Sequence, residues 1–178
     1  MAGGLTQYQE IMFKIDLIPH KDIADEQLKE IIFIKSTAWP HSFDKQVSWI
    51  FANIKESDIH VLLSLNEKKI AYLNLVKIGL SIDNRFIEGY GIGNVCSTER
   101  GKGWGRELMT QTNTYLIQNN KTGLLFCKET LVNFYNLNNW ILIAKEKLKL
   151  SFNNDSVETM IFNCKYKFHR LEYFGKSF

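Results

Sequence analysis

The chain has 178 residues, with 22 Lys and Arg against 19 Asp and Glu, 45% hydrophobic residues and two prolines. These values are those of an ordinary globular protein, and they exclude a disordered or collagen-like chain. The net charge of +3 is too small to indicate nucleic-acid binding by itself, although it is compatible with a small anionic ligand. The length predicts one domain that spans residues 1–178.

The three cysteines, Cys96, Cys127 and Cys164, lie far apart and form no C-x-x-C pair. We therefore expect neither a disulfide framework nor a metal site, and buried thiols in a reducing cytosol are the simpler interpretation. The N-terminus lacks the pattern of a signal peptide, and no segment approaches the ~18 apolar residues of a membrane span. The sequence thus predicts a cytoplasmic protein that does not bind a membrane.

Hydrophobic periodicity predicts a strand, two helices and a hairpin in the first half of the chain. In order, the expected elements are a strand at 10–18, a helix that begins near Asp22 and ends at Pro40, a helix capped by Ser42, and a hairpin of strands at 59–65 and 70–80. The polar residues between the last two strands form the turn.

The second half of the chain predicts a right-handed βαβ unit, a short helix and a second hairpin. The unit consists of a strand at 85–97, a helix at 103–118 and a buried strand at 123–128. The remaining elements are a short helix at 129–137 and two strands at 140–150 and 157–166, joined by a loop at 151–156. We expect the aromatic and basic end of the chain to pack against this body.

Two groups of glycines indicate close approach of a ligand to the backbone. Three of them alternate within residues 89–93, which leaves one side of a strand open or, alternatively, marks an irregular strand. Three more, within residues 101–105, connect that strand to a helix. Free amides and a partial positive charge at a helix start favour anions, so this turn predicts an anion site, with a turn without a ligand as the alternative. Neither a Walker A loop nor the dinucleotide fingerprint fits, because the latter needs glycine where Arg106 stands.

The glycine turn resembles the acyl-CoA pyrophosphate loop of the GCN5-related N-acetyltransferase superfamily (GNAT). The run Arg100-Gly-Lys-Gly-Trp-Gly105 matches every fixed position of the pattern Arg/Gln-x-x-Gly-x-Gly/Ala. The predicted order of elements is also that of this superfamily. The resemblance implies its α/β fold, a mixed and mostly antiparallel sheet with one parallel βαβ unit, flanked by helices.

The resemblance further implies acetyl-CoA as cosubstrate, without a metal. The residues expected to bind the cofactor, through main chain and charge, are Val95, Cys96, Ser97, Arg100, Gly101, Lys102, Gly103, Trp104, Gly105 and Arg106.

A second family signature, Tyr-x-x-x-Gly-Phe, is similar to the segment from Tyr135 to Trp140. Asn139 replaces the glycine, which is a mild change because Asn tolerates the left-handed conformation. The resemblance implies that Tyr135 donates a proton to the departing CoA thiolate; the alternative is a buried aromatic residue bonded to the backbone. Lys128 stands where the family often has an asparagine that contacts the pantetheine arm.

The implied reaction is direct attack of an amine on the acetyl group, and it needs the free amine. Glu88 resembles the family's glutamate base in type and position, with an exposed carboxylate at a strand end as the alternative. His60 is a weaker candidate, and an inward-facing or surface histidine is the simpler interpretation.

The resulting hypothesis is an N-acetyltransferase that acts on a primary amine. A small-molecule acceptor is favoured over a peptide amine, and the layout faintly resembles aminoglycoside acetyltransferases, although the sequence shows no obvious cluster of carboxylates for a polycation. The competing hypotheses are a non-catalytic acyl-CoA-binding or regulatory domain and a binder of other nucleotide phosphates. A homodimer and a longer acyl group stay open, and neither nucleic acid nor a membrane is expected as a partner.

Overall fold

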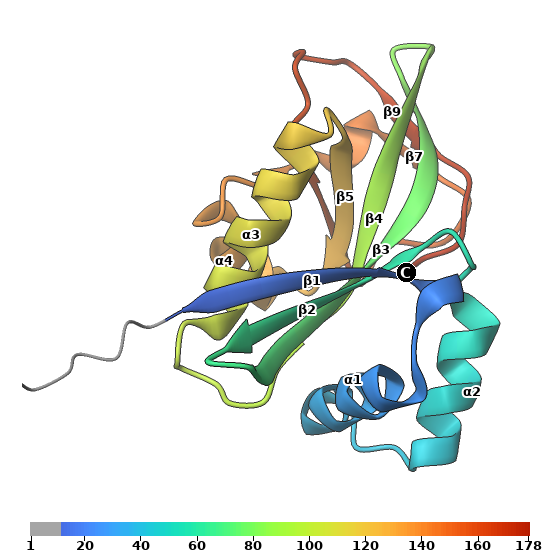
Figure 1. Ribbon diagram of the computed structural model, residues 1–178. Coiled ribbons are helices and arrows are strands. Elements are labelled where there is room, and N and C mark those ends of the chain that lie inside the picture. Colours follow the sequence, from blue (N-terminus) through green and yellow to red (C-terminus); the bar gives the residue numbers. More distant parts are fainter. Residues whose placement is uncertain (1–11) are drawn as a thin grey trace, which may run out of the picture.

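The computed structural model describes residues 12–178, so the first two residues of the predicted strand at 10–18 lie outside the described part (Figure 1). The described strands form one nine-stranded sheet, in the order β1-β2-β3-β4-β5-β8-β6, with β9 beside β3 and β7 beside β9. The strands are β1 (Phe13–Pro19), β2 (Ile59–Leu65), β3 (Lys68–Ile82), β4 (Arg85–Ser97), β5 (Thr122–Cys127), β6 (Ile141–Leu142), β7 (Leu148–Leu150), β8 (Glu158–Phe162) and β9 (Leu171–Tyr173). The helices are α1 (Asp25–Ala38), α2 (Phe43–Asn53), α3 (Trp104–Gln118) and α4 (Val132–Asn136), with short 3-10 turns η1 (His20–Asp22), η2 (Glu129–Leu131) and η3 (Lys145–Lys147).

Helices cover both faces of the sheet. Alternate residues of a strand point to opposite faces, so Leu62 packs in the core beneath α1 and α2, whereas Val61 and Leu63 pack in the core beneath α3 and α4. Within residues 12–178, no helix combines the length and the apolar character that crossing a membrane requires.

The first half of the chain confirms the predicted elements. Strands β1 to β4 pair antiparallel in sequence order, and Asn66 and Glu67 form the turn between β2 and β3 with φ of 48° and 69°. Ser42 caps α2, because its hydroxyl accepts a hydrogen bond from the Lys45 amide at 3.4 Å. Pro40 lies between the two helices, as expected.

The predicted βαβ unit is also confirmed. Strand β4 has the predicted bounds and pairs parallel with β5, and α3 connects the two strands. The fold class inferred from the sequence is therefore the observed one, a mixed α/β sheet with antiparallel strands around one parallel pair.

The predicted C-terminal hairpin is wrong. Only Ile141–Leu142 of the expected strand at 140–150 pairs with β8, because β8 has just five residues and Asn163 ends it with φ of 55°. The chain then turns through η3, and β7 pairs parallel with β9, which itself joins β3. Alternating apolar residues suggested one long strand, but the partner strand is too short to accommodate it.

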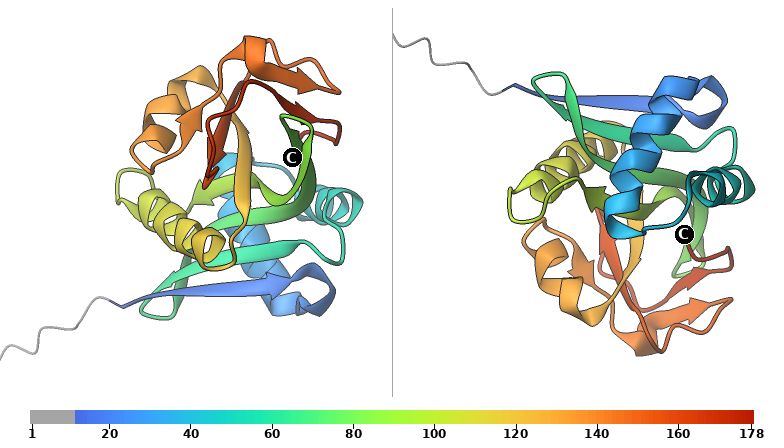
Figure 2. Two further views of the ribbon diagram at one scale, coloured as in Figure 1. Left: turned by 90° about the horizontal axis from the view of Figure 1, so that it is seen from above. Right: turned by 90° about the horizontal axis from the view of Figure 1, so that it is seen from below.

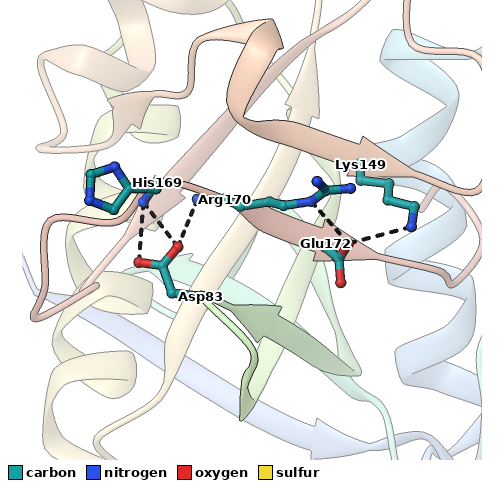
Figure 3. A network of polar contacts seen from close by, with 5 residues as sticks. All are labelled: Asp83, Lys149, His169, Arg170 and Glu172. Carbon is teal, nitrogen blue, oxygen red and sulfur yellow. Dashed lines mark hydrogen bonds and ion pairs between the residues drawn. The ribbon is translucent and has the colours of Figure 1, made fainter.

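The end of the chain packs against the body, as predicted. Two charged side chains fix it (Figure 3). The Asp83 carboxylate, in the turn between β3 and β4, accepts hydrogen bonds from the backbone amides of His169 at 3.0 Å and Arg170 at 2.8 Å. Glu172 on β9 pairs with Arg170 at 3.0 Å and with Lys149 on β7 at 3.5 Å. The last residues consequently run back between α2 and the C-terminal strands (Figure 2, right).

Candidate active site

Strands β4 and β5 separate in the middle of the sheet. Their parallel pairing ends at Ile92 and Leu125, although β4 continues to Ser97 and β5 to Cys127. A bulge accompanies the separation: Asn94 has φ of 54°, and the register between β3 and β4 shifts there. The backbone of β4 beyond Ile92 therefore faces an opening instead of a neighbouring strand.

The glycine turn lies at the end of β4 and begins α3. Gly101 and Gly103 have φ of 76° and 78°, and a Cβ atom at either would meet nothing within 4 Å. The first backbone bond of the helix runs from the Glu107 amide to the Gly103 carbonyl at 3.0 Å, so the amides just before Glu107 lack helical acceptors. The exposed basic side chains beside these amides are Arg100, Lys102 and Arg106. This geometry suits the diphosphate of a nucleotide.

A cleft of about 790 Å³, which we call the Tyr135 cleft, occupies the opening. It is lined by Lys35, Ala38, Trp39, His41, Lys45, Gln46 and Trp49 from the α1–α2 side, Ile92, Gly93, Asn94, Val95 and Arg100 from β4 and its loop, and Phe126, Cys127, Lys128, Leu131, Tyr135, Val157 and Phe178. Of the predicted cofactor residues, Val95 and Arg100 line it directly. Ser97 and residues 101–106 continue along the chain from its edge.

Tyr135 lies on α4 and faces this cleft. The residue is 6% exposed, and within the described chain its hydroxyl has no hydrogen-bond partner. Its carbonyl, by contrast, accepts from the amides of Asn138 and Trp140. Burial raises the pKa of the Tyr135 phenol, so the hydroxyl keeps its proton at neutral pH. Asn139 has φ of 65°, which is the left-handed conformation expected for a residue that replaces glycine.

Glu88 is not brought together with Tyr135. Its side chain is 72% exposed, and it accepts a hydrogen bond from Lys121 Nζ at 2.8 Å, which holds the pKa of the carboxyl below its usual value. Glu88 lies just before the stretch of β4, Gly89 to Ile92, that pairs with β5, whereas the opening follows that stretch.

His60 is buried in the core beneath α1 and α2, outside the Tyr135 cleft. Its two ring nitrogens lie 2.9 Å from His20 Nδ1 and 2.8 Å from the Tyr72 hydroxyl. Both nitrogens thus have partners inside the protein. Burial, with His20 and Lys35 nearby, lowers the pKa of His60 to about 3. The structure therefore supports the interpretation of His60 as an inward-facing histidine of the core.

This buried histidine predicts acid-sensitive stability. The pKa of His60 is about 3 when folded and about 6.5 when unfolded, so the unfolded chain binds more protons between these values. Its contribution is fully present above pH 6.5 and is lost as the pH falls, by up to about 1.4 kcal/mol per pH unit. The contribution of His60 to the free energy of unfolding is measured by urea unfolding of wild type and His60→Gln between pH 7 and pH 4. We expect a shallower pH dependence in His60→Gln and an unchanged one in the exposed control His169→Gln; equal slopes in all three proteins would contradict the assignment.

A second cleft of about 1540 Å³, the β3 cleft, shares Trp49 and Phe178 with the Tyr135 cleft. Residues 76–81 of β3 line it together with parts of α2 and the C-terminal segment. The Phe178 ring lies 5.0 Å from the ring of Phe126 on β5 and lines both clefts. A methyl group added to Gly91 would overlap this ring, so the glycines of β4 leave room here for the protein's own side chain.

Lys35, Asn94 and Phe178 are among the residues of the Tyr135 cleft that the sequence interpretation missed. Lys35 continues the apolar face of α1, and a charge at such a position is a signal that could have been noticed. Asn94 directly follows the alternating glycines, where a bulge is a plausible outcome. Phe178 had no local signal, because its place depends on the pairing of β9. Within residues 12–178, no three His, Cys, Asp or Glu side chains gather as a metal site would require.

No protein-family model matches the sequence, and no match was found among curated proteins. Solved structures do match. Escherichia coli ElaA has a TM-score of 0.60 at 19% identity, covering 85% of this chain and 99% of that chain. An acyl-CoA N-acyltransferase from Pseudomonas aeruginosa has a TM-score of 0.60 at 14% identity, covering 85% of this chain and 99% of that chain. The ribosomal-protein-S18-alanine N-acetyltransferase of Escherichia coli has a TM-score of 0.55 at 16% identity, covering 84% of this chain and 91% of that chain. The separated parallel strands, the glycine turn before α3 and these similarities together show that the chain has the fold of the GCN5-related N-acetyltransferases.

Proposed function

We propose that this protein is an acetyl-CoA-dependent N-acetyltransferase. The observation that carries the proposal is the separation of β4 and β5, beside which a cleft is lined by Arg100, just before the glycine turn, and by Tyr135. In this proposal the diphosphate of the cofactor binds the amides of residues 101–106. Its amide groups pair with the main chain of Val95 and Ser97, and the thioester lies near Tyr135.

In the proposed reaction, the nitrogen of the acceptor attacks the thioester carbonyl carbon. A C–N bond forms, the C–S bond breaks, and the thiolate takes the proton of Tyr135. The proton that the nitrogen loses on forming the amide then restores the Tyr135 hydroxyl. At pH 7, removing a proton from an amine with a pKa of ~10.4 costs about 4.6 kcal/mol. Among the described residues no carboxylate lines the Tyr135 cleft, and Glu88 lies outside it, so the proposal sends this proton to solvent.

The proposed acceptor is a primary amine of a small molecule or a peptide. A polycationic aminoglycoside would require carboxylates, and the described lining of the Tyr135 cleft supplies Lys35, Lys45, Arg100 and Lys128 instead. The second candidate function, a non-catalytic acyl-CoA-binding domain, is favoured by one observation: exposed Lys128 stands in the cleft where the family often has asparagine.

Two measurements on the wild-type protein test the proposal. Acetyl-CoA at a hundredfold excess over its dissociation constant should stabilise the fold by ~2.7 kcal/mol, and free thiol should appear when a panel of amines is added. A melting-temperature shift without thiol release would favour the non-catalytic domain. Displacement of acetyl-CoA by ATP or NAD would favour a general nucleotide-phosphate site, and no shift at all would contradict the cofactor assignment.

A further inference from the structure

Lys35 is a buried cation on the inner face of α1. Its exposed fraction is 2%, and its helix neighbours Ile31, Ile32 and Ile34 belong to the apolar core beneath α1 and α2. Lysine is almost never fully buried without a partner, because removal of its ammonium group from water is costly. The position therefore requires a physical explanation.

The ammonium group of Lys35 has an aromatic neighbour but no anionic one. Its Nζ atom lies 4.0 Å from the ring centroid of Trp49 on α2, a cation–π contact. Within residues 12–178, no carboxylate lies within 4.0 Å of Nζ and no acceptor takes a hydrogen bond from it. The contact with Trp49 stabilises the charge, and no described residue accepts a hydrogen bond from the three N–H donors of the ammonium, which lines the Tyr135 cleft.

The charged side chains on the wall of the Tyr135 cleft that α1 and α2 form are all positive. Lys45 lines the same wall of the Tyr135 cleft, as does His41, and Asp or Glu is absent from the described lining. Arg100 and Lys128 lie on the opposite side, at the ends of β4 and β5, where the proposed cofactor binds. The anionic cofactor therefore accounts for the positive charges of Arg100 and Lys128. It does not explain the positive charges on the wall that α1 and α2 form.

We infer that the amine acceptor also carries an anionic group, a carboxylate or a phosphate, and that Lys35 binds this group in the Tyr135 cleft. The inference rests on the proposed acetyltransferase function and names the substrate class of the same site. An anion would supply an acceptor that no described residue offers to the Lys35 N–H groups, as a charge-assisted contact. Trp49 would hold the lysine side chain in place before the acceptor arrives.

The surroundings of Lys35 predict how this preference depends on pH. Burial lowers the pKa of Lys35 to about 8, and Cys96 on β4 opposes the shift. The other titratable groups nearby are His60 on β2, whose low pKa keeps it neutral, and those that line the same cleft, which are His41, Lys45, Arg100, Cys127, Lys128 and Tyr135. Lys35 is therefore charged at pH 7 and neutral at pH 9, so selectivity for an anionic acceptor should fall as the pH rises through about 8.

Matched acceptor pairs test the inference: γ-aminobutyrate and its amide, phosphoethanolamine and ethanolamine, and the peptide amides Ala-Glu and Ala-Gln. The measured quantity is the ratio of kcat/KM between the anionic and the neutral member of each pair. We expect a ratio of about tenfold or more for at least one pair, and the pair that shows it identifies carboxylate or phosphate. Lys35→Met keeps an unbranched side chain but removes the ammonium group, and it should remove the preference. Lys29→Met, on the exposed side of α1, should keep it.

The outcomes separate this inference from the proposed function. Neutral members that react as well as anionic ones in all three pairs, or no turnover of any anionic member beside a normal acetyl-CoA shift, would overturn the inference alone. Loss of the acetyl-CoA shift in Lys35→Met would assign Lys35 to a cofactor phosphate and overturn it too. If Lys35→Met fails to fold, the ratio in wild type between pH 7 and pH 9 decides, and a constant ratio speaks against Lys35. Absence of an acetyl-CoA shift in wild type would overturn the proposed function itself.

Discussion

Replacement of Gly103 by aspartate should abolish the stabilisation of the protein by acetyl-CoA. Gly103 is the last residue before α3, with φ of 78° and open space where a side chain would begin. A carboxylate there would repel the diphosphate and compete with it for the free amides of the helix start. We expect the ~2.7 kcal/mol of stabilisation at a hundredfold excess of acetyl-CoA over the wild-type dissociation constant to disappear from the thermal shift.

Gly103→Asn is the matched control for this experiment. Asn and Asp have nearly the same shape and both tolerate positive φ, so the two variants share any backbone strain and differ in charge. Gly103→Asn should retain most of the acetyl-CoA shift, and the two variants should melt at similar temperatures without ligand. An undiminished shift in Gly103→Asp would show that the diphosphate binds elsewhere.

Tyr135→Phe should lower the turnover number for acetyl transfer by about a hundredfold. The change removes one hydroxyl that faces the Tyr135 cleft and has no partner within the described chain, so no internal hydrogen bond is lost. The departing thiolate, in contrast, loses its proton donor. Because the proposed cofactor contacts lie on β4 and the glycine turn, the thermal shift with acetyl-CoA should persist.

Tyr166→Phe serves as the control, since Tyr166 is 62% exposed and does not line the Tyr135 cleft. Its turnover should equal that of wild type. Equal turnover in Tyr135→Phe and wild type would remove Tyr135 from the mechanism while leaving the cofactor site intact. Loss of both turnover and the acetyl-CoA shift would mean that the hydroxyl contributes to binding.

Local patterns were sufficient for the central elements of the fold. Strand β4 and helix α3 were predicted within one residue, because a polar turn precedes the strand and glycines separate it from the helix. The C-terminal strands could not be predicted in this way. The pairing of β7 with β9 and of β9 with β3 joins residues far apart in the chain, and the alternating pattern of 140–150 says nothing about the length of its partner.

The same distinction holds for the candidate site. The glycine turn and Tyr135 belong to short contiguous patterns, and the structure places both beside one opening. The place of Glu88 depended on where β4 and β5 separate, and the pairing of Gly89 to Ile92 with β5 puts the opening at the other end of that stretch. Lys35 and Trp49 are fourteen positions apart on different helices, so only the packing of α1 and α2 reveals their contact.

Positions 91 and 178 share one volume, because the Phe178 ring fills the space that any side chain at Gly91 would need. A larger residue at 91 would therefore require a smaller one at 178, and a double substitution should be tolerated better than the change at 91 alone. The same residue, Phe178, lines both the Tyr135 cleft and the β3 cleft. We expect an acceptor long enough to extend into both clefts to displace Phe178 from its contacts with Phe126 and Tyr173. The free energy of that displacement would weaken binding, so the site should disfavour long acceptors.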